Sequence, residues 1–365
     1  MFIKSEGHVR RLKFLDGLRG WGAVFVLLYH VFSDGLPVDD TFGARLAYLV
    51  PFNGTLAVLV FFAVSGFSLS VRYLADGEVS AWLKIAAGRY LRLAIPIFAA
   101  CLIVHVAMIS GILDPSAARL PKFVESLNFD PTIGHLLRFS LLDVFFDYRA
   151  AQTYIGPLWT MSIELLGSFI VLLAIVIVRP LPGRSAILIV LAFLFVVLAP
   201  TGNSAMLALF PLGAAMADWF NRGWIDAIPK WTACILLLVG CVVPGALPFT
   251  VFNWGIIATS ALMLGCMAIP QIRSFLSGAF SSELGRISFP LYLMHGPAMH
   301  IIGEPLTRSV GASTALRFGI DVLVVVASVG AAYAFLPVNN FAIWMSRQVG
   351  AVMTGYFKAS TPAPR

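Results

Sequence analysis

The chain has 365 residues, of which 59% are hydrophobic and only 12% are charged, and its mean hydropathy is +0.89. These values exclude a water-soluble globular protein and indicate a chain built mainly of membrane-spanning segments, with the lipid bilayer as its first partner. The net charge of +7 does not indicate nucleic-acid binding, because the basic residues gather beside the apolar runs, as in cytoplasmic loops of membrane proteins.

Apolar runs long enough to cross a bilayer recur along the whole sequence. Since one span takes about 20 residues, the pattern predicts an all-α, polytopic transmembrane bundle of about ten spans. The fifth and sixth spans are short and are separated by a turn sequence, so they form either a tight hairpin or one broken helix. The predicted spans cover residues 14–33, 53–73, 91–113, 157–178, 185–200, 203–218, 231–248, 251–269, 285–303 and 317–337.

The distribution of basic residues predicts the orientation of the chain. Lys and Arg are frequent in the N-terminal segment and then in every second loop. Asp34, Asp39 and Asp40 lie in the first loop on the opposite side of the membrane. An even number of spans then places both termini in the cytoplasm. No small-residue cleavage site follows the first span, so we interpret it as an uncleaved signal anchor. Residues 1–345 are predicted to form one transmembrane domain, and residues 346–365 a short, mobile cytoplasmic tail.

The sizeable loop of residues 114–156 contains an amphipathic stretch from Ile133 to Phe146, which we expect to lie in the membrane interface. His105 is a lone histidine of the third span with a structural role, and His300 and Glu304 belong at the outer interface. The cysteines lie in apolar runs without metal-ligand spacing, so we expect small core residues and no metal site. They are Cys101, Cys234, Cys241 and Cys266.

Ionisable residues inside the predicted spans mark the candidate site, because an unpaired charge there costs about 2.5–3.5 kcal/mol. Arg19 and His30 are almost three helical turns apart in the first span, so their side chains share one face. Glu164 enters the fourth span at a depth comparable with that of His30 and needs a partner. We expect His30 and Glu164 to be catalytic, with the histidine as general base and the carboxylate fixing its tautomer. Sugar binding or a bridge between helices are the alternatives for Glu164.

Further polar residues of the spans complete this set. Arg89 and Arg92 are three residues apart, so both guanidinium groups lie on one side of the third span and can bind phosphate oxygens. The alternative is ordinary anchoring at the cytoplasmic interface. Ser65 places a small polar group where another helix or a ligand comes close. Tyr292 and His295 lie on one side of the ninth span, and we expect them to bind substrate or to support the structure of the site.

Five motifs follow one another along these spans. The first span has an arginine and a histidine separated by ten residues, the second has Phe-Phe-x-x-Ser-Gly-Phe, and the third has Arg-x-x-Arg. The fourth has Leu-Trp-Thr-x-x-x-Glu, and the ninth has Ser-Phe-x-x-Tyr-Leu-x-His. In this order they resemble the membrane-bound acyltransferase 3 family over residues 14–340. Leu165 stands where that family often has a second acid, and Thr160 where serine is common.

The resemblance implies an integral membrane O-acyltransferase of the bacterial plasma (inner) membrane. Such an enzyme moves an acyl group, most commonly acetyl, from cytoplasmic acyl-CoA to a hydroxyl of a cell-surface or exported carbohydrate such as lipopolysaccharide. It implies acyl-CoA, above all acetyl-CoA, as donor substrate and no permanently bound cofactor. Arg19, Arg89 and Arg92 would then hold the phosphates of the donor.

Two other functions fit the same composition. Intramembrane His, Arg and Glu residues also occur in proton-coupled transporters of small solutes, although the sequence shows no internal symmetry of the kind that inverted repeats leave. The chain could also be a scaffold of the polysaccharide-synthesis machinery in which the polar groups are purely structural. Acyl transfer by the purified protein separates the first function from both alternatives.

Overall fold

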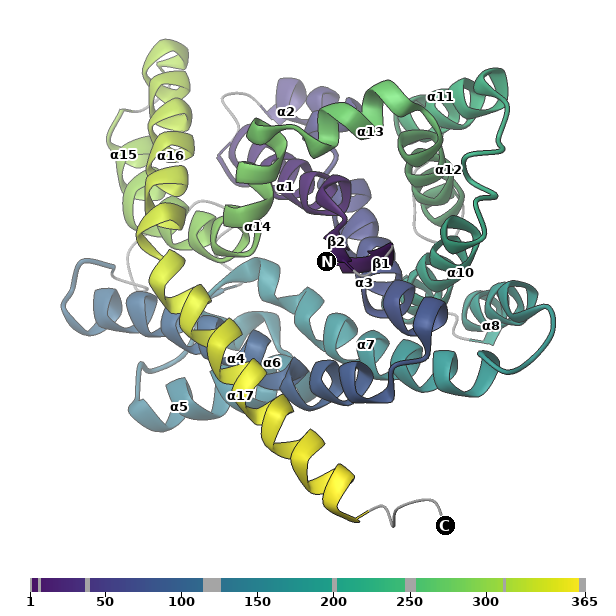
Figure 1. Cartoon of the computed structure of the whole chain (residues 1–365). Helices are drawn as coiled ribbons and strands as arrows, with labels where there is room; N and C mark the ends of the chain where they lie inside the picture. Colours follow the sequence, from purple (N-terminus) through teal and green to yellow (C-terminus); the bar gives the residue numbers. More distant parts are fainter. Residues whose placement is uncertain are drawn as a thin grey trace.

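The computed structural model describes residues 2–5, 8–36, 40–113, 126–198, 202–246, 254–310 and 313–360. The first residues form an antiparallel hairpin of β1 (Phe2–Ser5) and β2 (His8–Arg11), in which Phe2 pairs with Arg11. The remaining described residues form helices and their connections (Figure 1), which confirms the predicted all-helical fold.

The helices follow one another through the described part of the chain with short connections. They are α1 (Lys13–Leu28), α2 (Asp40–Leu46), α3 (Gly54–Asp76), α4 (Val79–Ile109), α5 (Ile133–Arg138), α6 (Val144–Phe146), α7 (Thr160–Val178), α8 (Arg184–Leu198), α9 (Gly202–Ala205), α10 (Leu209–Asn221), α11 (Lys230–Ala246), α12 (Ile256–Ala268), α13 (Pro270–Ser277), α14 (Ala279–Ala298), α15 (Glu304–Ser309), α16 (Thr314–Ala334) and α17 (Leu336–Ser360). Three segments continue helices in π-helical form, namely η1 (Tyr29–Gly35) after α1, η4 (Phe139–Asp143) after α5 and η9 (Met299–Gly303) after α14.

Four helical segments of the described residues are long and apolar enough to cross a membrane: α3, α4, α16 and Gly156–Val178, which contains α7. Helices α12 and α13 pass the same test together but are bent by 89°, so they make at most one broken span. Helices α8 and α11 are apolar but shorter, and α1 has only 16 residues before η1 begins. The count of about ten spans and the orientation of the termini stay predictions.

Glycines set how closely the central helices approach one another. Helix α1 lies against α14 at Gly20 and Gly285, where a Cβ on Gly20 would come within 2.5 Å of the Gly285 nitrogen. Helix α3 crosses α10 at Gly66, which contacts the backbone of Phe210. Small residues at such crossings let helix backbones pack closely, which is the usual way in which membrane helices associate.

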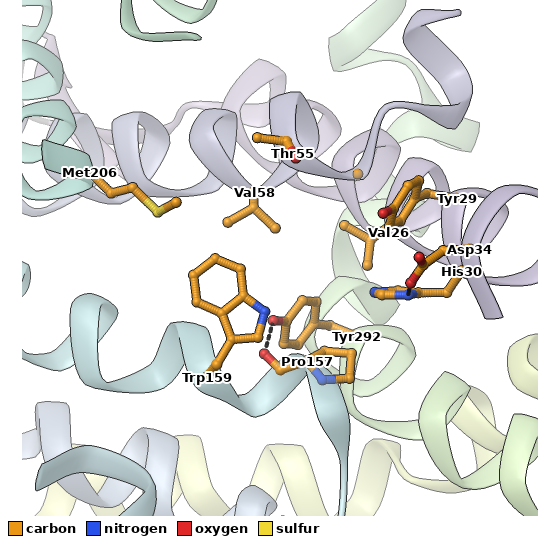
Figure 2. Close-up of a pocket in the computed structure, with 11 residues that line it drawn as sticks. Val26, Tyr29, His30, Asp34, Thr55, Val58, Pro157, Trp159, Met206 and Tyr292 are labelled. Atoms are coloured by element: carbon orange, nitrogen blue, oxygen red, sulfur yellow. Dashed lines mark hydrogen bonds and ion pairs between the residues drawn. The ribbon is translucent and has the colours of Figure 1, made fainter. Parts of the chain in front are cut away.

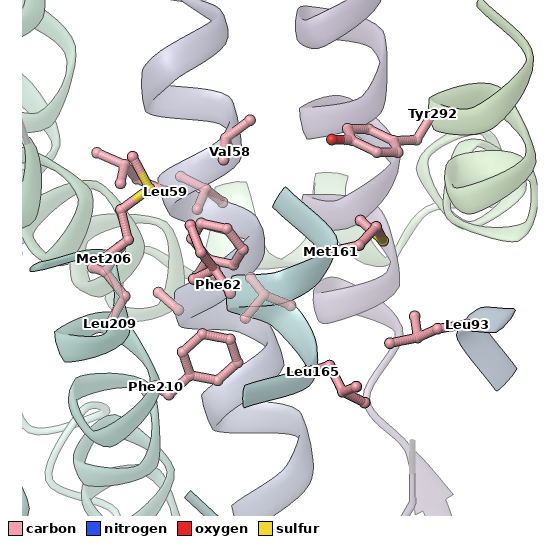
Figure 3. Close-up of a cluster of buried hydrophobic side chains, with 14 of the residues drawn as sticks. Val58, Leu59, Phe62, Leu93, Met161, Leu165, Met206, Leu209, Phe210 and Tyr292 are labelled. Carbon is pink, nitrogen blue, oxygen red and sulfur yellow. The ribbon is translucent and has the colours of Figure 1, made fainter. Parts of the chain in front are cut away.

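The core lies where α3, α7 and α10 meet (Figure 3). Phe62 and Phe210 are fully buried there, with 5.6 Å between their ring centroids. Leu165 of α7 belongs to the same cluster and is 4% exposed. An apolar residue therefore suits this position, and a second acid beside Glu164 would lie in an apolar environment.

Helix α17 differs from the expected mobile tail, because the chain stays helical to Ser360. It runs along α4 (Figure 1), and glycines on both helices allow the close contact. A Cβ on Gly88 of α4 would come within 2.5 Å of the Ser346 carbonyl oxygen, and one on Gly350 within 2.7 Å of the Lys84 carbonyl oxygen. The prediction missed this helix because Asn, Ser, Arg and Gln interrupt its apolar pattern.

Helix α4 also begins earlier than the predicted third span, at Val79 rather than at residue 91. Arg89 and Arg92 therefore lie inside a long helix and not at its opening. Helices α8 and α10 lie side by side (Figure 1), so the fifth and sixth predicted spans form a hairpin rather than one broken helix.

Several smaller predictions can be compared with the structure. The stretch from Ile133 to Phe146 is helical, as α5, a π-helical turn and α6, and its place in the membrane interface stays a prediction. His300 and Glu304 are both buried where α14 continues through η9 into α15, and their place at the outer interface stays a prediction. Cys101 and Cys266 are buried as expected, whereas Cys241 is partly exposed and Cys234 of α11 is exposed.

Candidate functional site

A cavity of about 230 Å³ opens where η1, the N-terminal part of α3, the start of α7 and α14 approach one another (Figure 2). Val26, Val58 and Met206 supply much of its apolar wall. A small concave site with apolar walls and a few converging polar groups is the usual form of a ligand site. The lining residues with polar side-chain groups are Tyr29, His30, Asp34, Thr55, Trp159 and Tyr292.

His30 lies where α1 changes to the π-helical η1, a backbone form that is frequent at functional sites. Its Nδ1 is 3.5 Å from Oδ2 of Asp34, one turn further along. The Tyr29 hydroxyl is hydrogen-bonded to the same carboxylate. A carboxylate beside Nδ1 favours the tautomer that has its proton there, which leaves Nε2 of His30 as the acceptor.

His295 forms the wall behind this histidine. Its ring stacks on that of His30, with 5.3 Å between centroids and 21° between planes, and it is only 1% exposed. Its Nδ1 lies 3.1 Å from the Leu291 carbonyl oxygen, which can only accept, so Nδ1 carries the proton. The buried Nε2 then has a free lone pair, and it has no hydrogen-bond partner among the described residues.

Tyr292 joins the cavity to the start of α7. Its hydroxyl donates to the Pro157 carbonyl oxygen at 2.6 Å (Figure 2). The same hydroxyl lies 2.6 Å from Oγ1 of Thr160. These contacts fix the turn that carries Trp159 into the cavity wall. Tyr292 thus has a positioning role besides lining the site, and Thr160 serves this contact with the hydroxyl that serine would also supply.

Glu164 finds its partner in Arg89 and not in His30, which corrects the expected pairing. The two form a buried ion pair between α7 and α4, and Ser65 of α3 donates to Glu164 Oε1 at 2.7 Å. The Arg89 Nε donates to Ser168 Oγ at 2.9 Å. Glu164 therefore bridges three helices, as its structural alternative predicted. Ser65 serves this bridge, while the neighbouring Gly66 makes room for α10.

The three arginines singled out in the sequence are brought together. Arg19 of α1 and Arg92 of α4 both lie within electrostatic range of Arg89 and of Glu164. Arg89 is buried and forms an ion pair with Glu164, whereas Arg92 is exposed and Arg19 is partly exposed. The side chains of Arg19 and Arg92 make no hydrogen bond or ion pair with the described residues, although Asp16 is within electrostatic range of Arg19. Of these three arginines, Arg19 and Arg92 are therefore the ones whose guanidinium groups can bind an anion.

The cavity and the arginine cluster are neighbours inside the bundle. Tyr292 lines the cavity and lies within electrostatic range of Glu164, the central carboxylate of the cluster. Along α1, Arg19 and His30 are separated by about 16 Å of helix axis at 1.5 Å per residue. A ligand that contacts both places therefore needs an anionic end and a reactive end joined by an arm of about this length.

Asp34 is the site residue that sequence reasoning missed. Hydropathy assigns it to the first loop, yet η1 prolongs the helix and brings its carboxylate back to His30. The signal that could have found it is the four-residue spacing from His30, which brings two side chains together on one helix face. The other histidine of interest, His105, has the expected structural role, with its Nδ1 3.1 Å from the Tyr154 hydroxyl.

Of three comparisons with known proteins, one finds a match. A family model described as an acyltransferase domain matches residues 12–336, which include the cavity and the three arginines. No curated protein and no solved structure matches the chain. The family match and the apolar helices identify a multi-pass membrane protein and support an acyltransferase.

Proposed function

The chain belongs to the acyltransferase 3 family, and we propose that it moves an acyl group from cytoplasmic acyl-CoA to a hydroxyl of a cell-surface or exported carbohydrate. Acetyl-CoA is the first candidate donor, and the bacterial plasma membrane is the proposed location. The observation that carries the proposal is the cavity of His30 lying next to a cluster of arginines, with Tyr292 and Glu164 between them.

The donor would occupy both places. Its phosphates suit the guanidinium groups of Arg19 and Arg92, which have no ion-pair partner in the described residues and can bind phosphate oxygens in bidentate fashion. The thin pantetheine arm would extend past Glu164 towards the cavity. Arg89 contributes indirectly, because it holds Glu164 and so positions α4 against α7.

The chemical step follows from the surroundings of His30. A sugar hydroxyl is too weakly acidic to attack a thioester unaided, and a positioned base contributes about 10²–10⁴ in rate. Nε2 of His30 takes the hydroxyl proton while the sugar oxygen bonds to the acyl carbon. The carbon–sulfur bond breaks, and the CoA thiolate leaves and receives the proton from His30. Asp34 stabilises the intervening imidazolium, as the carboxylate of a catalytic triad does.

The acceptor would approach from the cavity side. Trp159 and Tyr29 line the cavity with aromatic rings, and Asp34 and Thr55 supply polar groups. A sugar ring offers an apolar face to such rings and hydroxyl groups to such polar atoms, so the lining suits one carbohydrate unit.

One observation favours a second function, a proton-coupled transporter. Asp321 lies inside α16, is 1% exposed, and has both carboxylate oxygens without a hydrogen-bond partner among the described residues. An ionisable residue inside a membrane helix is typical of proton pathways. If the chain is an enzyme, Asp321→Asn should transfer acyl groups normally, whereas a transporter should lose coupling in that variant.

Mass spectrometry of surface glycans from cells with and without the chain tests the proposal. We expect a mass difference equal to one acyl group per modified sugar, and fragmentation identifies that sugar. Purified protein supplied with acetyl-CoA and the glycan should then produce the same modification together with free CoA. Identical glycans in both cells, or movement of an unmodified solute by the purified protein, would contradict the proposal.

A further inference from the structure

We propose that Arg347 of helix α17 is a further donor-binding residue that binds the ribose 3′-phosphate of acyl-CoA. Helix α17 lies almost entirely beyond the residues that the family model matches, so this residue is not part of the family's domain. The inference deepens the proposed function and rests on it.

The packing of α17 on α4 fixes the place of Arg347. Gly88 lies directly against the backbone of Ser346, and Gly350 against that of Lys84, so the two helices run in opposite directions in a defined register. Arg347 follows Ser346 and thus stands beside the turn of α4 that precedes Arg92. Arg92 and Arg347 lie within electrostatic range of each other.

The charges around Arg92 are unbalanced in a way that calls for an anion. Guanidinium groups from α1, α4 and α17 converge there, namely those of Arg19, Arg89, Arg92 and Arg347. Asp16 and Glu164 are the carboxylates that act on Arg19, and Glu164, which pairs with Arg89, is the one that acts on Arg92. Arg92 and Arg347 are both exposed and take part in no ion pair with the described residues. Repulsion among these cations is relieved when a ligand brings several negative charges.

The order of the cations from α1 through α4 to α17 matches the order of groups in acyl-CoA. The thioester must reach His30, so the pyrophosphate follows along the pantetheine arm, and the 3′-phosphate of the adenosine lies farthest from the reaction. Arg347 lies beside Gly88, one turn of α4 before Arg92. It is within electrostatic range of Arg92 but is not among the groups that act on Arg19, which shares α1 with the approach to His30. We therefore assign the pyrophosphate to Arg19 and Arg92, and the 3′-phosphate to Arg347.

The test compares two donors, acetyl-CoA and its 3′-dephospho form, with the full-length protein and Arg347→Ala. We expect Arg347→Ala to raise KM for acetyl-CoA about tenfold with kcat unchanged, as for a charge-assisted hydrogen bond. KM for the dephospho donor should be the same in variant and parent protein. Gln348→Ala, an exposed neighbour on α17, controls for changes in the helix, and Arg347→Lys should restore part of the affinity.

Each other outcome has a distinct meaning. An unchanged KM for acetyl-CoA in Arg347→Ala would overturn the inference. An equal rise in KM for both donors would show that Arg347 does not bind the 3′-phosphate. Loss of binding to phosphatidylglycerol vesicles in the same variant would instead show that Arg347 binds a lipid headgroup. Calorimetry with CoA alone separates the two proposals. Parent protein that binds CoA through Arg347 but transfers nothing contradicts the function, and parent protein that does not bind CoA contradicts both.

Discussion

The ring of His30 stacks on the ring of His295, with 5.3 Å between their centroids. His295 is buried and carries its proton on the nitrogen that faces the Leu291 carbonyl, so it provides a neutral wall. Two positive rings at this separation would repel each other strongly in a dry site. The two rings are therefore suited to carry one positive charge between them, which arises when His30 takes the proton of the acceptor hydroxyl and is lost when His30 gives that proton to the CoA thiolate.

Replacing His30 by alanine should abolish acyl transfer, with a loss of about 10²–10⁴ in kcat, because the base is removed. Membrane level and Tm should stay near those of the parent protein. His105→Ala is the matched control, since that histidine contacts Tyr154 and does not line the cavity, so its loss should lower Tm while turnover persists. Parent-like transfer by His30→Ala would remove this residue from the site.

Asp34→Asn should lower kcat while KM for the donor stays unchanged, because the amide no longer stabilises the imidazolium of His30. A triad carboxylate contributes up to about 10⁴ in rate, which bounds the expected loss. Asp147→Asn is the control, because that carboxylate pairs with Arg149 on an exposed loop. Steady-state kinetics at several donor concentrations measure the effect, and a rise in KM alone would assign Asp34 to binding instead.

The sequence predicts which residues form the site better than it predicts their partners. Burial cost alone indicates that Glu164 needs a partner, and this is correct. The choice between His30 and Arg89 depends on how α7 is turned against α4, and one sequence holds no information on that rotation. Asp34 escapes prediction for a related reason, since the hydropathy pattern ends before η1 does.

Helix α17 shows the same limit at the level of the fold. Its apolar residues alternate with Asn, Ser, Arg and Gln, so it falls below the threshold for a membrane span. It is stabilised by contact with α4, where Gly88 and Gly350 let the two backbones meet. Each glycine meets the backbone of the other helix, and one sequence does not show that two segments so far apart in the chain pack together.

The adjacent residues Ser65 and Gly66 should differ sharply in their response to alanine. Ser65→Ala removes one hydrogen bond to Glu164 and should cost about 1 kcal/mol, since Arg89 still pairs with that carboxylate. Gly66→Ala places a methyl group against the backbone of Phe210 and should cost about 1–3 kcal/mol or more. Tm in detergent compares the two. A larger loss of donor affinity than of stability in Gly66→Ala would indicate that this glycine faces a ligand.

Replacement by alanine should also have different effects at Arg89 and at Arg92, although both belong to one motif. Arg89→Ala leaves Glu164 buried without its partner, which typically costs about 3–5 kcal/mol, so the protein level should fall. Arg92→Ala removes an exposed cation without a partner in the described residues, so Tm should not change while KM for the donor rises about tenfold.

A double variant identifies the cause of the first effect. Arg89→Ala combined with Glu164→Gln removes the unpaired charge, so Tm should recover part of the loss seen in Arg89→Ala alone. If the double variant is no more stable than the single one, the ion pair does not account for the destabilisation. If Arg89→Ala instead keeps its Tm and loses donor affinity as Arg92→Ala does, then Arg89 binds the donor directly and Glu164 is not its principal partner.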